Sequence, residues 1–157
     1  MTDLTISNAA FTKIVDIANN SEVMQGLVSA GILPPTFRVV SGSVTLPLAI
    51  SGVAAVLDAS GNPLVLGEGE QIILGSTYAT TTVAGTNTAV ITLGLAPAST
   101  TAPAVALNSW TVAATTADLD EPFSGTAEVD ATNKYVTVGL ATAVLTAGAA
   151  NVFLIIV

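Results

Sequence analysis

Apolar and polar residues alternate along several short stretches between residues 43 and 140. The apolar sets are Val44, Leu46, Leu48 and Ile50; Ala89, Ile91, Leu93 and Leu95; Trp110, Val112 and Ala114; and Val136, Val138 and Leu140. Alternate side chains of an extended chain point to opposite faces, so each stretch predicts a β-strand with one buried face. Because Pro47 has no N–H to donate, its strand is expected at the edge of a sheet.

The closing segment, 151–157, is apolar on both faces. One face carries Val152, Leu154 and Ile156, and the other carries Phe153, Ile155 and Val157. A strand of this kind is expected to be covered on both sides, because neither face can be left in water. A partner sheet covers one face. The other is covered by the N-terminal segment or by a neighbouring subunit, and the pattern favours the neighbour.

Turn-forming residues separate these stretches. Short turns are predicted at 58–63, 67–69, 85–87 and 130–133, and longer loops at 97–103 and 118–125. Several short strands without helical patterns between them predict an all-β domain at residues 36–157. We expect an antiparallel β-sandwich, either jelly-roll-like or a small barrel.

Residues 1–35 follow a different pattern and predict a short N-terminal helical arm. Apolar residues occur there at helical spacing, with Ser21 as an N-cap and Gly31 as the residue after a helix, before Pro34-Pro35 ends it. These apolar stripes either pack on the chain's own sheet or contact another protein, and the double proline favours the second role. The candidate interface residues are Phe11, Ile14, Val15, Met24 and Leu27 of the arm, with Phe153 and Ile155 of the closing strand.

The composition leaves little room for chemistry. The 157 residues include no histidine, no cysteine and three basic residues against eleven acidic ones, for a net charge of −8. Binding to nucleic acids or to anionic membrane surfaces needs clustered lysine and arginine. The three basic residues, Lys13, Arg38 and Lys134, are scattered along the chain, which argues against both kinds of partner. No stretch approaches the length of apolar sequence that a membrane-spanning helix needs.

Each of two acidic motifs can be interpreted either as an ordinary turn or loop or as a functional site. The run Asp58-Ala59-Ser60-Gly61 superficially resembles the Asp-Ser-Gly of aspartic proteases, but an extra alanine interrupts it and a hairpin turn is favoured. The carboxylates of Asp118, Asp120 and Glu121 are of the kind that binds calcium, but the sequence favours a solvated loop. We therefore expect no enzyme activity, no catalytic residue, no metal and no cofactor.

Charged residues make up only 9% of the chain. A free monomer usually carries a more charged surface, which keeps strand edges from pairing with other molecules. The low charge predicts that much of this surface is covered in an assembly.

Four segments resemble the small β-sandwich decoration (cement) proteins on the heads of tailed phages, particularly phages of aquatic bacteria. They are Gly-Asn-Pro-Leu-Val-Leu at 61–66, Gly-Glu-Gln-Ile-Ile-Leu at 69–74, Ala-Val-Ile-Thr-Leu-Gly-Leu at 89–95, and 136–148 before the final strand. The resemblance covers about residues 36–157 and lies in pattern and composition. It implies a non-enzymatic virion protein, often a homotrimer, that binds where capsomers meet.

The leading hypothesis is therefore a structural protein that decorates the outside of a viral capsid after assembly in the host cytoplasm. Its expected partners are the major capsid protein and copies of itself, as a trimer. The alternative is a receptor- or carbohydrate-binding β-sandwich module of a viral fibre or adhesin, with Trp110, Tyr78 and Tyr135 as candidate aromatic platforms. A third hypothesis is a hydrolase that uses carboxylates and a metal.

Overall fold

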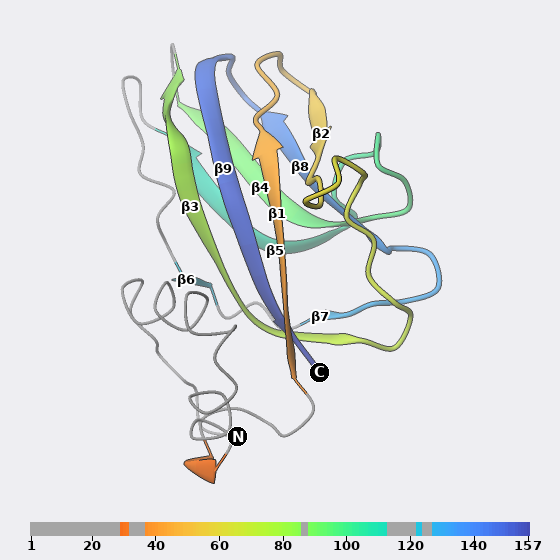
Figure 1. Ribbon diagram of the computed structural model, residues 1–157. Helices are drawn as coiled ribbons and strands as arrows, with labels where there is room; N and C mark the ends of the chain where they lie inside the picture. The colour runs from red at the N-terminus through yellow and green to blue at the C-terminus, as the bar shows by residue number, and fades with distance from the viewer. Residues whose placement is uncertain (1–28, 32–36, 86–87, 113–121, 124–126) are drawn as a thin grey trace.

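The computed structural model describes residues 29–31, 37–85, 88–112, 122–123 and 127–157. These residues form a sandwich of two antiparallel β-sheets (Figure 1). The strands are β1 (Arg38–Thr45), β2 (Val53–Ala55), β3 (Gln71–Gly85), β4 (Ala89–Ala96), β5 (Val105–Val112), β6 (Pro122–Phe123), β7 (Ala127–Glu128), β8 (Tyr135–Ala141) and β9 (Leu145–Ile156). No helix in this part of the chain has the length and hydrophobicity to cross a membrane.

The strand order identifies the kind of sandwich. One sheet has the order β1-β9-β3-β6, with β7 also paired to β3, and the other has the order β2-β8-β4-β5. The chain passes back and forth between the sheets, and its last strand lies between β1 and β3. This is the wrapping of a jelly roll, which confirms the predicted all-β antiparallel sandwich and favours a jelly roll over a closed barrel.

The alternating residues line the space between the two sheets. All of the predicted inward residues of β4 and β8 are buried, as are Trp110 and Val112 of β5, while Ala114 lies outside the described residues. Val152, Leu154 and Ile156 of β9 join the same core. The period of two therefore located the buried faces of β4, β5 and β8 correctly, because one face of each strand meets the opposite sheet.

The predicted strand over 43–50 is wrong in its extent. Leu46 is buried, but the strand ends at Thr45, and Leu48 and Ile50 are 47% and 54% exposed. The backbone turns where the Gly52 N–H donates to the Ala49 carbonyl at 2.9 Å. The edge position is confirmed, since β1 pairs with only β9 among the described strands.

The predicted N-terminal arm and the predicted 118–125 loop lie outside the regular alternation. In the predicted arm, Ser29 is helical and Gly31 has φ +71°, as expected of a residue that ends a helix, and the other arm residues lie outside the described residues. The predicted loop over 118–125 is wrong at Pro122–Phe123, which forms β6 and pairs with Ser76 and Gly75 of β3. Pairing with β3 holds this short segment in an extended conformation, which its composition does not predict.

The predicted 97–103 loop connects β4 to β5 and covers part of the outer face of the second sheet. Thr137 of β8 is fully buried on that face, and its hydroxyl donates to the Thr101 carbonyl at 3.0 Å. An added Cβ on Gly139 would lie 3.2 Å from Pro103, so the loop rests directly on the sheet. This sheet therefore has both faces covered where the loop crosses it.

Candidate functional site

The outer face of the β1-β9-β3 sheet carries the two predicted interface residues of the closing strand. Ile155 lies in register between Val39 of β1 and Leu74 of β3, and it is fully buried within a single chain. Phe153 is half-buried. The expected cover on both faces is thus confirmed at Ile155. Of these two residues, only Phe153 has surface left for another molecule, and an interface role for either stays a prediction.

The remaining predicted interface residues cannot be placed. Phe11, Ile14, Val15, Met24 and Leu27 lie outside the described residues. A small apolar cluster does lie near the point where the chain enters β1, around Leu74 and Ile155, and Phe37, Val39 and Ile73 pack against it. The described part of the chain thus carries apolar residues at the end of the sandwich where the arm begins.

The aromatic candidates for a carbohydrate platform lie in different places. Trp110 is only 7% exposed and belongs to the core between the sheets, so the prediction that it offers a platform is wrong. Tyr78 is 51% exposed on the outer face of the first sheet, directly opposite Asn151 in register. Tyr135 is half-buried at the start of β8. Only Tyr78 presents a large exposed aromatic surface among the three.

Asp58 is a turn residue, which confirms the interpretation favoured from the sequence. Its Oδ1 accepts the N–H groups of Ser60 and Asn62 at 2.8 and 2.9 Å, and the Gly61 N–H donates to its carbonyl. A carboxylate that satisfies its own turn is typical of Asx turns. The Ser-Gly that follows therefore serves the hairpin and resembles a protease motif by chance.

Glu70 holds together the turn before β3. Its side chain accepts hydrogen bonds from the Gly67 N–H, at 2.6 Å, and from the Arg38 guanidinium, with which it also forms an ion pair. Burial raises the pKa of the Glu70 carboxyl, but the bonds from Arg38 and Gly67 and the Arg38 charge outweigh it and hold the pKa below its usual value. Arg38 is thus engaged with this turn.

Asp130 organises the predicted turn before β8. Its Oδ1 accepts the N–H groups of Thr132 and Asn133 at 2.7 and 2.6 Å, and its Oδ2 accepts the Asn133 side-chain amide at 2.9 Å. The backbone bond from Asn133 is the main cause that lowers the pKa of Asp130 below its ordinary value of 3.8. The folded state thus prefers the ionised carboxylate.

This preference predicts a change in the acid stability of an Asp130→Asn variant. Because the folded pKa lies below the unfolded one, the stabilisation by Asp130 is complete above the unfolded pKa and is lost as the pH falls through the folded pKa. Asparagine keeps an acceptor oxygen but does not titrate. We expect the free energy of unfolding of the variant to fall less steeply with acidification below pH 3.8, measured by urea unfolding from neutral to acidic pH. Glu128→Gln, an equal change of charge on β7, is the control, and an unchanged slope in Asp130→Asn would contradict the expectation.

The predicted acidic loop cannot be tested as a metal site, because Asp118, Asp120 and Glu121 lie outside the described residues. Within the described ranges, no three acidic, histidine or cysteine side chains gather as a candidate metal site. The solvated loop that the sequence favours over a calcium site there stays a prediction.

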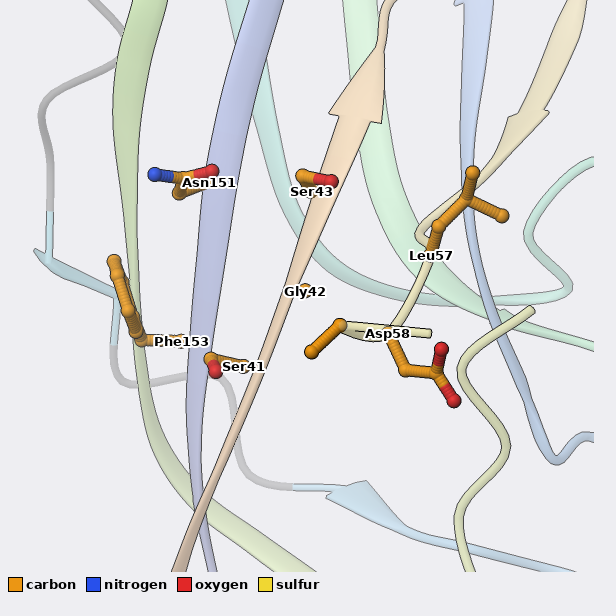
Figure 2. A pocket seen from close by; sticks show the side chains of 8 residues that line it. Ser41, Gly42, Ser43, Leu57, Asp58, Asn151 and Phe153 are labelled. Atoms are coloured by element: carbon orange, nitrogen blue, oxygen red, sulfur yellow. The ribbon is translucent and has the colours of Figure 1, made fainter. Parts of the chain in front are cut away.

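A shallow open groove of about 210 Å³ runs beside the edge strand β1. Figure 2 shows Ser41 and Ser43 on β1, Asn151 and Phe153 on β9, and the Asp58 carboxylate directed away from β1. Ser43 exchanges two backbone hydrogen bonds with Leu57, at 2.8 and 2.7 Å, which protects this part of the edge from pairing with another chain. The lining of the groove is mixed, because Leu57, Ala59 and Phe153 lie beside its polar residues.

A second surface lies at one end of the sandwich, where the loop after β1 meets the turn between β8 and β9 (Figure 1). Leu48, Ile50 and Val144 are exposed there. Sequence reasoning placed Leu48 and Ile50 in a buried face and did not single out Val144. The proline at 47 and the glycine at 52 bracket this loop, and they are the features of the sequence that could have indicated a turn. We call these three residues the apolar end.

No protein-family model matches the chain, and no curated protein matches it. Solved structures do resemble it. A chain in the capsid asymmetric unit of cyanophage Pam1 has a TM-score of 0.52 and 17% identity, over 77% of this chain and 84% of that one. A chain in the acid-stable capsid of Helicobacter pylori bacteriophage KHP30 has a TM-score of 0.46 and 11% identity, over 77% and 92%.

At these identities the likeness concerns the fold alone, and of these two matches the cyanophage chain is the one similar enough to compare folds. The two chains share one β-sandwich over most of their lengths. Similarity of fold with little identity of sequence is common among jelly rolls, because the alternating pattern and the turns specify the sandwich and leave most surface residues free to differ. The described sandwich therefore has the fold of a chain found in a phage capsid.

Proposed function

We propose that this protein is a structural component of a phage virion, a decoration protein that binds the outside of the capsid shell and stabilises it without catalysis. The observation that carries the proposal is the fold shared with a chain in the cyanophage Pam1 capsid, over 77% of this chain and 84% of that one. The correspondence includes most of both chains, so a protein of similar size and architecture already occupies a capsid. The major capsid protein is the proposed partner.

The surface of the sandwich supports a role in protein–protein contact. Among the residues that the structure describes, six large apolar side chains are exposed, namely Leu48, Ile50, Leu57, Val65, Tyr78 and Val144. Charged residues make up only 9% of the chain. Apolar surface with few charges is typical of the centre of a protein interface.

The proposed mechanism is thermodynamic. A protein that binds the assembled shell and not its free subunits shifts the equilibrium toward the assembled state. Each contact is weak, but several copies bound around one shell act together, since each neighbouring contact forms at high effective concentration.

Particles that lack this protein are expected to release their genome at a lower temperature than complete particles. The measurement is a thermal-release assay with a dye that binds freed DNA, alongside survival of osmotic shock. Adding the purified protein back should restore the release temperature, and adding an unrelated β-sandwich protein of similar charge should not. Equal release temperatures with and without the protein would contradict the proposal.

A second candidate function, receptor or carbohydrate binding, is favoured by one observation. Tyr78 is exposed on the same sheet face as Asn151 and Ser43, its in-register neighbours, and these two residues line the groove beside β1. Hydroxyl and amide groups next to an aromatic ring are typical of sugar sites. Glycan-array binding that disappears in Tyr78→Ala would support this function, and an array without reproducible hits would remove it.

A further inference from the structure

One edge of the first sheet has no neighbouring strand along part of β1. On its inner side, β1 pairs with β9 over its whole length in a register without a bulge. On its other side, among the described residues, only Ser43 exchanges backbone hydrogen bonds, with Leu57. The chain then leaves β1 at Asp58, whose carboxylate accepts the N–H groups of the turn. We call the remaining stretch of this side, from Arg38 to Ser41, the open edge.

The direction of the backbone groups on the open edge follows from the printed hydrogen bonds of β1 itself. In an antiparallel strand, the N–H and C=O groups of successive residues point to opposite sides. Ser43 bonds to Leu57 on the side away from β9, whereas the Leu46 N–H donates to a β9 carbonyl at 3.0 Å. Because Ser41 and Val39 alternate with the residues that face β9, as Ser43 does, their N–H and C=O groups also point away from β9.

β1 lacks the usual protection of an edge strand. Edge strands are commonly short or bulged, or carry prolines and charges that prevent pairing with another chain. Among the described edge strands, β2 and β6 have three and two residues, and β5 pairs with β4 through an irregular register. β1 has eight residues without proline or lysine, and its one charged residue, Arg38, is paired with Glu70. The Ser41 side chain is exposed, so another molecule can reach this edge.

The groove beside β1 adjoins the open edge. Ser41 of β1 and Phe153 of β9 line it (Figure 2), together with Leu57 and Ala59 of the segment that leaves β1. A row of N–H and C=O groups along a strand is matched by a second extended backbone, which supplies both kinds of group at the same spacing. An extended peptide therefore fits this surface, with its main chain on the open edge and an apolar side chain beside Leu57 or Phe153.

Charge distinguishes between such peptides. The chain has a net charge of −8, so it repels acidic segments. Near the open edge, Arg38 is paired with Glu70, and no basic side chain among the described residues is paired with Asp58. The charge left for a partner is therefore negative, and a segment that carries lysine or arginine is complementary to it.

We propose that the open edge of β1 binds an extended, positively charged segment of the major capsid protein as an added β-strand. Main-chain hydrogen bonds at such an edge provide affinity, and the side chains beside it provide selectivity. The inference rests on the proposed function for the source of the segment. It adds which part of this chain makes the contact and which chemistry the partner brings.

The first test is hydrogen exchange of single amides, in the free protein and in particles to which the protein has been added back. In the free protein, the Val39 and Ser41 amides should exchange fast, and the Val40 and Gly42 amides, which face β9, should exchange slowly. Binding to particles should slow exchange at Val39 and Ser41 by roughly tenfold or more. Slow exchange of these two amides in the free protein would overturn the inference, because the chain's own arm or a second copy would then occupy the edge.

The second test compares Ser41→Pro with Ser41→Ala in binding to the same particles. Proline removes the outward N–H and leaves the bonds to β9 in place, as is tolerated on edge strands. It should weaken binding by roughly tenfold or more, since it removes a hydrogen bond and blocks the approach of the added strand. Ser41→Ala is the matched control, because it removes only the hydroxyl and should bind like the wild type. Urea unfolding of both variants checks the fold, and if proline lowers the midpoint, the exchange measurement on the wild type decides.

Salt should weaken binding, because the contact joins opposite charges. Binding that does not change with salt would overturn the assignment of a positively charged segment. Wild-type protein that protects particles from heat while Val39 and Ser41 still exchange fast would overturn the inference and leave the proposed function standing. The same holds if Ser41→Pro folds and binds as tightly as Ser41→Ala. Wild-type protein that does not bind particles at all would overturn both.

Discussion

Trp110→Ala is expected to lower the free energy of unfolding by about 3–5 kcal/mol, the largest effect of any single substitution we consider. Trp110 is 7% exposed and packs in the core between the two sheets, so alanine would leave a large cavity there. Small domains have a total stability of about 5–15 kcal/mol, so the loss is a large fraction of it. The measurement is guanidinium unfolding followed by far-UV circular dichroism, because the variant has no tryptophan fluorescence.

Two controls separate the loss of packing from the loss of an aromatic surface. Trp110→Phe keeps a ring in the core and should cost much less than alanine. Tyr78→Ala removes an aromatic side chain that is 51% exposed and should cost under about 1 kcal/mol. If Trp110→Ala unfolded at the wild-type midpoint and lost only glycan binding, the tryptophan would be a surface platform and its assignment to the core would be wrong.

Gly94→Ala is expected to cost about 3 kcal/mol, at the upper end of what overpacking costs. A Cβ at this position of β4 would overlap the Val105 carbonyl oxygen and lie 2.8 Å from the Pro103 Cβ. The neighbouring backbone cannot easily withdraw, because the Ala104 N–H donates to the Leu95 carbonyl at 2.8 Å. The same unfolding measurement applies.

Gly61→Ala is the matched control for Gly94→Ala. Gly61 has φ +82° and nothing within 4 Å of an added Cβ, so alanine there meets backbone strain without a clash. The expected cost is about 1 kcal/mol. A Gly94→Ala variant no less stable than Gly61→Ala would show that the 97–103 loop moves aside, and the close contact of this loop with the sheet would then have no energetic importance.

Local patterns predicted the strands and turns well. Alternation located the inward faces of β4, β5 and β8, because a strand in a sandwich has one face against the opposite sheet whatever its neighbours are. The stretches that begin with Asp58 and Asp130 were predicted as turns from their turn-forming residues, and each carboxylate accepts N–H groups of the next few residues. Both predictions depend only on chemistry within a few positions of the chain.

The effects of long-range contacts could not be predicted from the sequence. Leu48 and Ile50 continue the alternation of Val44 and Leu46, yet they are exposed because the strand ends at Thr45 and the chain turns at 49–52. The sequence of β3 does not show a simple alternation. A bulge between Ile72 and Leu74 places Ile72 in the core and Leu74 on the outer face. The candidate site was predicted least well, because Val144 lies near the loop of Leu48 and Ile50 only in the folded chain.

The amino-acid sequence by itself determined that the chain holds an all-β domain with turns at defined places, and that it is poor in charge and has no histidine or cysteine. Those properties follow from the period of a strand and from the side chains available. The tertiary structure alone decided that Ile155 is covered within one chain and that Leu48 and Ile50 are exposed at one end of the described sandwich. Such facts depend on which distant segments pack together, and a one-dimensional pattern does not record that choice.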